Sequence, residues 1–308
     1  MRTHINEFQF NNILELIKKD YAVFAPQKIN GVITLAPLAN KKNLRLGAKS
    51  VVPFKKILWP DGDEYESINK IAFLGLPLCD VHALHILLKK LGTNAPIKRN
   101  NILIIASDCK RDSTCFCEVF NADHLNGFDL YIESDAERYK ILSDTELGER
   151  YLKELKLKES KALKLERDKV NKTFNINNEL SILIADKDAN SDFWSKIGNN
   201  CFGCSACSLV CPLCFCSKQQ VKIDESIEYK WDSCFSKSFS EIQNHHDMRP
   251  ERKDRIYNWY HHKFVRSPHE NDDFLCTGCG RCITACPANI NIKNILSYFD
   301  KTIEDKLK

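Results

Sequence analysis

The hydrophobic pattern at the start of the chain predicts one helix followed by short extended segments. Residues 6–19 carry apolar side chains at helical intervals, with polar residues between them, which indicates an amphipathic helix. The runs that come next are short and apolar and are punctuated by Pro and Gly, as is typical of strands and turns. These extended segments are predicted at residues 21–26, 31–37 and 51–60.

From residue 71 the pattern changes to strand, helix, strand. The runs at 71–80 and 101–109 are almost continuously apolar, as in buried strands of parallel sheets. Helical spacing over 80–92 ends at Gly92, which is typical of a C-cap. We therefore expect an α/β N-terminal domain with a mixed, mainly parallel sheet. Two more strands and a helix are predicted at residues 128–134, 138–144 and 145–157.

The second half of the chain divides into two further parts. Residues 149–198 contain many charged helix formers around a thin stripe of leucine, which predicts a charged helical connector that ends in a helix over 192–200. From residue 199 the sequence is rich in loops and cysteine. We expect three parts: an α/β domain at 1–148, the connector at 149–198, and a helical and loop-rich domain at 199–308.

Composition and charge argue against a nucleic-acid-binding, a membrane-spanning and a secreted protein. The chain has 308 residues and 43% hydrophobic content, enough for one large or two ordinary domains, and its net charge of +4 predicts no nucleic-acid partner. No window of 18 continuous apolar residues is present, so no membrane span is expected. The opening MRTHINEFQFNN lacks the pattern of a secretory signal. The 15 cysteines are therefore expected in the reducing cytoplasm, where clustered cysteines indicate metal or redox chemistry.

Two similar cysteine runs carry the strongest chemical signal, CFGCSACSLVCP at 201–212 and CTGCGRCITACP at 276–287. Both fit C-x2-C-x2-C-x3-C-P, the bacterial ferredoxin pattern for [4Fe–4S] clusters. Three cysteines of each run wrap one cluster, and the fourth, carried away on the next helix, ligates the other cluster. One cluster is predicted on Cys201, Cys204, Cys207 and Cys286. The second cluster is predicted on Cys276, Cys279, Cys282 and Cys211.

Zinc is the alternative occupant, because zinc sites also use C-x2-C pairs. Four evenly spaced cysteines followed by proline, present twice, favour iron–sulfur clusters. We expect small residues in both runs to let backbone N–H groups approach the sulfurs, which tunes the reduction potential. These residues are Gly203, Ser205, Gly278 and Gly280. Because thiolates fill every predicted ligand position, the pair is expected to conduct electrons rather than to react with a substrate.

Four cysteines in the N-terminal half form a second group. Cys79 and Cys109 each end a predicted strand, and Cys115 and Cys117 follow in the motif STCFCEVF. Ends of adjacent parallel strands lie at one edge of a sheet, so these thiols are expected to meet there. A third [4Fe–4S] cluster is one interpretation. Another metal, or buried cysteines that ligate nothing, are the other interpretations, and one of the CxC pair is expected to point away.

The long insertion between the two runs, residues 213–275, contains the remaining cysteines, Cys214, Cys216 and Cys234. Three thiols are one short of a closed [4Fe–4S] site. They either supplement the N-terminal group, hold a cluster with one ligand that is not cysteine, or only pack in the core. All three interpretations stay open.

The order of these elements resembles a known family. The motifs GLPLCD, SDCKRDSTCFC, CFGCSACSLVCPLCFC, WDSC, MRPERKDR, HHKF and CTGCGRC resemble the iron–sulfur (beta) subunit of cytosolic NiFe sulfhydrogenases and the related iron–sulfur component of anaerobic sulfite reductase. The likeness extends from about residue 50 to residue 295. Where that family has Gly-x-Arg-Pro-Cys-Asp, this chain has Gly75-Leu-Pro-Leu-Cys-Asp80, so the arginine is absent and the proline is displaced.

The resemblance implies an electron-transfer subunit without catalysis of its own. It implies a partner flavoprotein that holds FAD and exchanges electrons with NAD(P)H, or a ferredoxin-linked one, and a hydrogenase or sulfur- or sulfite-reducing module. The sequence shows no G-x-G-x-x-G turn and no P-loop, so we expect no flavin or nucleotide on this chain. The alternative is a self-contained reductase that acts on a disulfide or sulfur compound at an atypical cluster of the extra cysteines. The weak charge disfavours a cluster-bearing nucleic-acid-binding protein.

Overall fold

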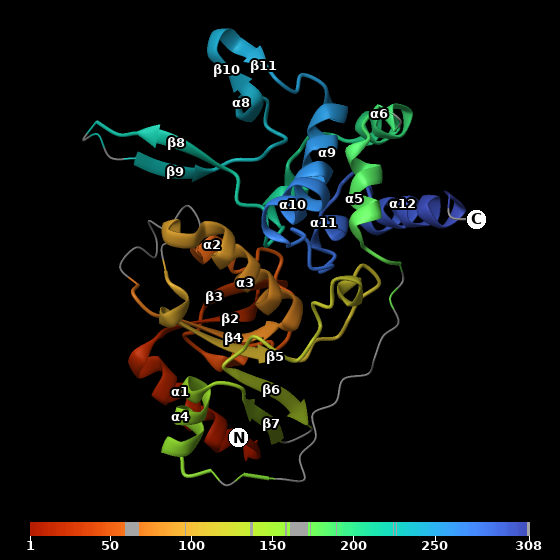
Figure 1. Cartoon of the computed structure of the whole chain (residues 1–308). Helices are drawn as coiled ribbons and strands as arrows, with labels where there is room; N and C mark the ends of the chain where they lie inside the picture. The colour runs from red at the N-terminus through yellow and green to blue at the C-terminus, as the bar shows by residue number, and fades with distance from the viewer. Residues whose placement is uncertain are drawn as a thin grey trace. The chain divides into compact units, whose positions relative to one another are not determined.

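The computed structural model divides into two compact units (Figure 1). In unit 1 the structure describes residues 1–58, 68–95, 97–112, 123–135, 138–157 and 159–160. In unit 2 it describes residues 113–122, 172, 174–188, 190–223, 225 and 227–306. The segment 113–122, which lies within the N-terminal half of the sequence, thus belongs to the unit that holds both cysteine runs.

Unit 1 is built on a seven-stranded sheet with the order β1-β7-β6-β5-β4-β2-β3. The four central strands β2, β4, β5 and β6 run parallel, whereas β1, β7 and β3 pair antiparallel at the two ends. The strands are β1 (Arg2–Asn6), β2 (Ala22–Ile29), β3 (Val32–Pro37), β4 (Ile71–Pro77), β5 (Ile102–Ser107), β6 (Leu130–Asp135) and β7 (Arg138–Ser143). The predicted α/β domain with a mixed, mainly parallel sheet is confirmed.

The helices of unit 1 cover both faces of this sheet (Figure 1). One core cluster joins buried residues of α1 and α4 to side chains of β4, β5 and β6. The helix α1 starts at a capping box in which the Asn6 side chain accepts from the Gln9 backbone N–H. The helices are α1 (Glu7–Asp20), α2 (Lys55–Leu58), α3 (Leu78–Leu91) and α4 (Glu146–Glu154), with short 3-10 turns at Lys41–Asn43, Gly92–Asn94 and Arg99–Asn101.

Most predicted elements of this unit are present, with one correction. The strands β4 and β5 are buried at every position, as their continuous apolar runs predict, and α3 follows β4 directly and ends at Gly92. The extended prediction for residues 51–60 is wrong over Lys55–Leu58, which form α2. Residues 59 and 60 lie outside the described part of the chain. Within α2, Ile57 and Leu58 are buried, so the apolar residues of this segment face the core from a helical turn rather than from a strand.

Unit 2 consists of helices around an aromatic core, with two small antiparallel hairpins. Its helices are η5 (Cys117–Phe120), α5 (Asn178–Ala185), α6 (Ser191–Asn200), α7 (Ala206–Leu209), α8 (Lys237–Ser240), η6 (Gln243–His245), α9 (Arg252–His261), the π-helical turn η7 (His262–Arg266), α10 (Ser267–Asn271), α11 (Arg281–Thr284) and α12 (Ile292–Lys306). The hairpin strands are β8 (Ser217–Val221), β9 (Ile227–Trp231), β10 (Glu241–Ile242) and β11 (His246–Asp247). Among the described residues Trp194 is the largest fully buried side chain, and its ring is stacked on Phe299 and tilted against Tyr260.

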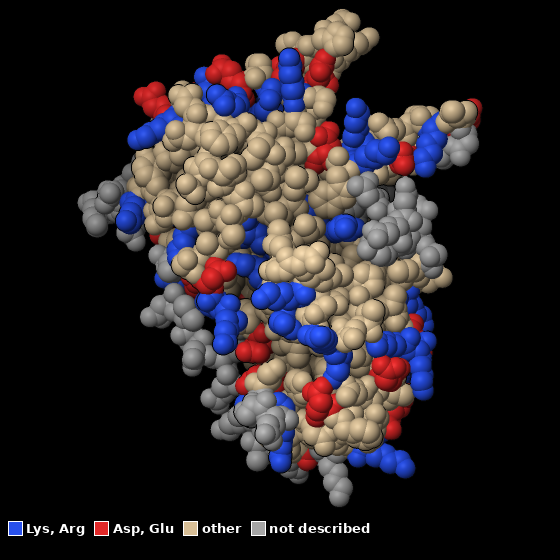
Figure 2. Space-filling model, turned by 180° about the vertical axis from the view of Figure 1, so that it is seen from behind, with Lys and Arg blue, Asp and Glu red and all other residues tan. Residues whose placement is uncertain are grey.

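The predicted connector falls largely on residues that the structure does not describe. Residues 158, 161–171 and 173 lie outside the described part of the chain, while 146–154 form α4 in unit 1. No helix in the described chain is long and apolar enough to cross a membrane. On the face drawn in Figure 2, groups of Lys and Arg side chains stand beside acidic ones, in keeping with the weak net charge.

Candidate metal centre

The two cysteine runs follow the same backbone path. Gly203 and Gly278 occupy equivalent places and have φ of +67° and +65°. Two residues later, Ser205 and Gly280 are again left-handed, with φ of +65° and +75°. A short helix follows in each run, α7 in the first and α11 in the second, and these two helices contact each other. The repeat in the sequence is therefore a repeat in structure.

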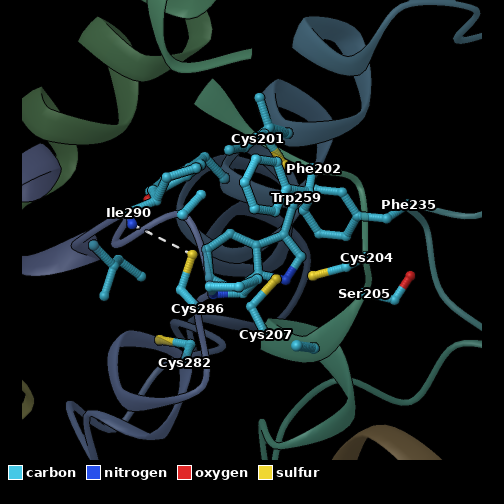
Figure 3. A pocket seen from close by; sticks show the side chains of 16 residues that line it. Cys201, Phe202, Cys204, Ser205, Cys207, Phe235, Trp259, Cys282, Cys286 and Ile290 are labelled. Atoms are coloured by element: carbon cyan, nitrogen blue, oxygen red, sulfur yellow. Dashed lines mark hydrogen bonds between the residues drawn. The ribbon is translucent and has the colours of Figure 1, made fainter. Parts of the chain in front are cut away.

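The first pocket gathers the four cysteines of the first predicted ligand set (Figure 3). Three of them come from the run at 201–207, and Cys286 comes from the end of the other run. Aromatic and aliphatic side chains complete the wall, among them Phe235, Trp259 and Ile290. The cavity between them measures about 40 Å³. The crossed fourth cysteine that the spacing predicts thus lies beside the three of the other run.

The second pocket gathers the other predicted set. Cys276, Cys279 and Cys282 line it together with Cys211 from the first run, around a cavity of about 20 Å³. Phe116 and Leu213 contribute apolar wall. The two pockets share Trp259, Cys282 and Ile292 as lining residues, so they are immediate neighbours within unit 2. The sequence predicts this closeness from the exchanged ligands.

Backbone N–H groups donate to the sulfurs at equivalent positions of both runs. Gly203 N donates to Cys201 Sγ at 3.4 Å, and Gly278 N donates to Cys276 Sγ at 3.5 Å.

The crossed cysteines accept in the same way. Cys211 Sγ accepts from Leu213 N at 3.4 Å, and Cys286 Sγ accepts from Ile290 N at 3.3 Å (Figure 3). Hydrogen bonds of this kind stabilise negative charge on sulfur and adjust the potential of an iron–sulfur cluster.

Burial of the thiols raises the free-energy cost of ionising them. Burial raises the pKa of Cys207 and of Cys276 to about 12, and raises the pKa of Cys282 well above its ordinary range. A thiolate in such a place needs a compensating positive group, which ligated iron supplies.

A [4Fe–4S] cluster fits both sites by the chemistry of the donor set. The first pocket presents the four sulfurs of its predicted set, with Cys282 also in its wall, and the second pocket presents its own four, both within largely apolar walls. None of the 15 cysteines, all of which are described, forms a disulfide. Among the described residues, no three His, Cys, Asp or Glu side chains converge as ligands of a single metal ion.

The segment 113–122 packs against the second cysteine run. Phe116 N donates to Gly278 O at 2.8 Å. A Cβ added to Gly278 would lie 2.3 Å from Phe116 O, and one added to Gly280 would lie 2.5 Å from Thr114 O. Only glycine allows this approach, so the two glycines that were predicted to favour sulfur hydrogen bonds also seat this segment.

The four cysteines of the predicted third site are divided between the units. Cys79 is the second residue of α3 and Cys109 follows β5, both in unit 1. Cys115 and Cys117 belong to unit 2, and Cys117 is buried at the start of η5. A third cluster on these residues stays a prediction.

The three cysteines of the insertion lie near one another within unit 2. The Cys216 side chain hydrogen-bonds to Cys234 and raises the pKa of that thiol, and burial raises it further. Cys214 and Cys207 act on Cys234 through their charges in the same direction. All three cysteines of the insertion belong to the hydrophobic core of unit 2 or pack against it. Ligation by any of them stays a prediction.

Sequence reasoning missed Lys263. This lysine is 2% exposed, and its Nζ donates to Cys211 Sγ at 3.2 Å. Burial alone would lower the pKa of Lys263, but the thiolates of Cys211, Cys214 and Cys276 hold it well above the ordinary range. No spacing rule points to this residue, because its contact with Cys211 joins positions far apart in the chain.

Comparisons with known proteins agree with this geometry. A family model described as a 4Fe-4S dicluster domain matches residues 200–290, a range that includes both predicted ligand sets. The chain is similar to sulfhydrogenase 2 subunit beta of Pyrococcus furiosus, with 28% identity over 327 aligned positions that cover 93% of this chain and 95% of the relative. No solved structure matches the chain.

Proposed function

Because the chain is similar to a sulfhydrogenase beta subunit and carries a 4Fe-4S dicluster domain, we propose that it is an iron–sulfur beta subunit of this kind and relays electrons within an oxidoreductase complex. One observation carries the proposal. Two adjoining pockets are each lined by one complete set of four cysteines, and they share Trp259, Cys282 and Ile292. Neighbouring redox centres with every ligand position filled suit electron transfer better than substrate binding.

The residues have distinct roles in this relay. The first site is held by Cys201, Cys204, Cys207 and Cys286, and the second by Cys276, Cys279, Cys282 and Cys211. A bound [4Fe–4S] cluster supplies a centre that takes up and releases one electron at a time. The wall of Trp259, Phe235 and Ile290 excludes water, and the backbone N–H groups of both runs hold the sulfurs in place.

The partners of the relay are proposed from the relative. Sulfhydrogenase 2 subunit beta is by its name one part of a larger enzyme. We propose a flavoprotein subunit, with FAD and linked to NAD(P)H or ferredoxin, on one side of this chain. A NiFe hydrogenase or a sulfur- or sulfite-reducing module stands on the other side. The absence of a G-x-G-x-x-G turn and of a P-loop in the sequence supports a nucleotide site on a partner, and the cysteine content supports a cytoplasmic location.

The test separates the relay from catalysis. The anaerobically purified chain should be bleached by dithionite and left unchanged by NADH or NADPH. Adding the flavoprotein subunit should make it reducible by one of these nucleotides. In the complex, Cys207→Ser should abolish turnover with the physiological donor while the flavin is still reduced at the normal rate. Normal turnover in this variant, or reduction of the lone chain by a nucleotide, would disprove the proposal.

A second candidate rests on the thiols of the insertion. The hydrogen bond between Cys216 and Cys234, with Cys214 and Cys207 close by, places additional sulfur chemistry beside the first site. A self-contained reductase of disulfides or sulfur compounds would use this group. Turnover of a disulfide by the isolated, dithionite-reduced chain, lost in Cys234→Ser, would favour it over the relay.

A further inference from the structure

Lys263 stands at the second site in an unusual stretch of helix. It belongs to the π-helical turn η7, directly after α9. Turns of this type are rare and occur often at functional sites, because the wider turn redirects side chains. Here the turn brings the lysine to the wall of the pocket lined by Cys211, Cys276, Cys279 and Cys282.

The contacts of this lysine leave its charge without an acidic partner. Its Nζ donates to Leu275 O at 2.8 Å and to Cys211 Sγ at 3.2 Å, and it lies 4.9 Å from the centroid of the Trp259 ring. Lysine is almost never fully buried unless its charge is paired. Among the described residues no carboxylate pairs with it. A cluster bound by Cys211, Cys276, Cys279 and Cys282 would carry negative charge next to this ammonium group.

The first site has no equivalent of Lys263 among the described residues that line its pocket. Among the described residues that line its pocket there is neither Lys nor Arg. Arg252 lowers the pKa of Cys201, although burial, the larger effect, raises it, and the charge of Lys263 reaches Cys207 of this set without a printed hydrogen bond. Arg252 is exposed, so solvent screens its charge, whereas a buried charge is screened much less. Lys263 is thus a buried positive charge that hydrogen-bonds to a cysteine of the second set, and no lining residue described for the first pocket does the same there.

We infer that Lys263 raises the reduction potential of the second site above that of the first. The potential of an iron–sulfur cluster depends on net charge, on hydrogen bonds to sulfur and on exposure to solvent. Lys263 changes the first two of these in the same direction, because its ammonium group attracts the added electron and its N–H bond stabilises the charge on Cys211 Sγ. The first electron to enter the pair therefore rests at the second site.

This inference rests on the proposed relay. The electron comes from a one-electron donor, which is the proposed partner subunit in the complex and dithionite in the experiment. The second site gains one electron and one negative charge, and the donor loses the same. Lys263 compensates this charge without the making or breaking of any bond. The first site has the lower potential, so it passes an electron to the oxidised second site. It stays reduced itself only after the second site has been reduced.

The test is a redox titration followed by EPR on the full-length, anaerobically purified chain. Signals are assigned with Cys204→Ala, which removes the first site, and Cys279→Ala, which removes the second. In the wild type the second site should be reduced first. In Lys263→Met, which keeps the length but loses the charge and the donor, its midpoint should fall. A shift of about 59 mV or more corresponds to a tenfold change in a one-electron equilibrium.

The matched control is Arg252→Met, which removes the exposed cation of the first site and should leave both midpoints nearly unchanged. Lys263→Gln keeps a donor without the charge and should shift the second midpoint in the same direction but less. Reduction of the first site before the second in the wild type would overturn the inference without any variant. Unchanged midpoints in Lys263→Met with full iron content would also overturn it. A wild type that lacks iron would overturn the proposed function itself.

Discussion

At the scale of single residues, left-handed backbone positions shape both cysteine runs. Gly278 has a φ of +65°, and a side chain there would collide with the backbone of Phe116. Its N–H donates to Cys276 Sγ and its carbonyl accepts from Phe116 N. One glycine thus joins a predicted ligand of the second site to the segment that packs on it.

Gly278→Ala should be costly for this reason. The left-handed conformation costs about 1 kcal/mol for an L residue, and overpacking against backbone adds about 1–3 kcal/mol. We expect the free energy of unfolding of unit 2 to fall by about 2–4 kcal/mol, measured by anaerobic denaturant titration.

Gly31→Ala is the matched control for this substitution. Gly31 also has a left-handed φ, of +82°, but nothing lies within 4 Å of an added Cβ. Gly31→Ala should lower the free energy of unfolding only by the backbone strain, about 1 kcal/mol. Equal losses in the two variants would show that the contact between Gly278 and Phe116 does not matter for stability.

The spacing of cysteines predicts some residues of the candidate sites and not others. The eight ligand positions of the two predicted sets follow from the spacing of the cysteines, because three ligands per cluster are local in the sequence. Lys263 is different. Its approach to Cys211 depends on a π-helical turn and on tertiary packing, neither of which leaves a periodic signal.

At the scale of elements, the aromatic core of unit 2 holds the helices around the candidate sites. Trp194 on α6 is 1% exposed and contacts Tyr260 on α9 and Phe299 on α12. Tyr260 in turn lines the first pocket. Packing at Trp194 therefore supports the wall of the first site through one intermediate side chain.

Trp194→Ala should destabilise unit 2 by about 3–5 kcal/mol, because a large buried side chain leaves a cavity that its neighbours fill only in part. The decrease is measured by anaerobic denaturation followed at the aromatic CD bands. Ile223→Ala is the control, since Ile223 is fully exposed and should change the stability by less than about 0.5 kcal/mol. A similar small effect for Trp194→Ala would contradict its place in the core.

Elements with strong local signals were predictable, and those formed by distant pairing were not. The strands β4 and β5 are apolar throughout, and the capping box and one-sided apolar spacing of α1 are local features. The strand β1 has the mixed sequence RTHIN, and it forms by pairing with β7, far along the chain. The helix α2 is only one turn long, too short for helical periodicity to appear.

At the scale of the whole molecule, the proposed relay depends on exchange of ligands between two stretches of chain. Cys211 ends the first run but lines the second pocket. Cys286 ends the second run but lines the first pocket. This exchange makes the two sites one cooperative structure, because neither can be completed by a single run.

The most direct test is the iron content of paired cysteine variants, prepared anaerobically and analysed for iron, acid-labile sulfide and zinc. If the ligands are exchanged, Cys286→Ala and Cys204→Ala affect the same cluster, so combining them should remove only about four irons per chain. Combining Cys286→Ala with Cys279→Ala should remove about eight, since both clusters lose a ligand. The reverse pattern of losses, or zinc in place of iron in the wild type, would contradict the exchange of ligands and the relay built on it.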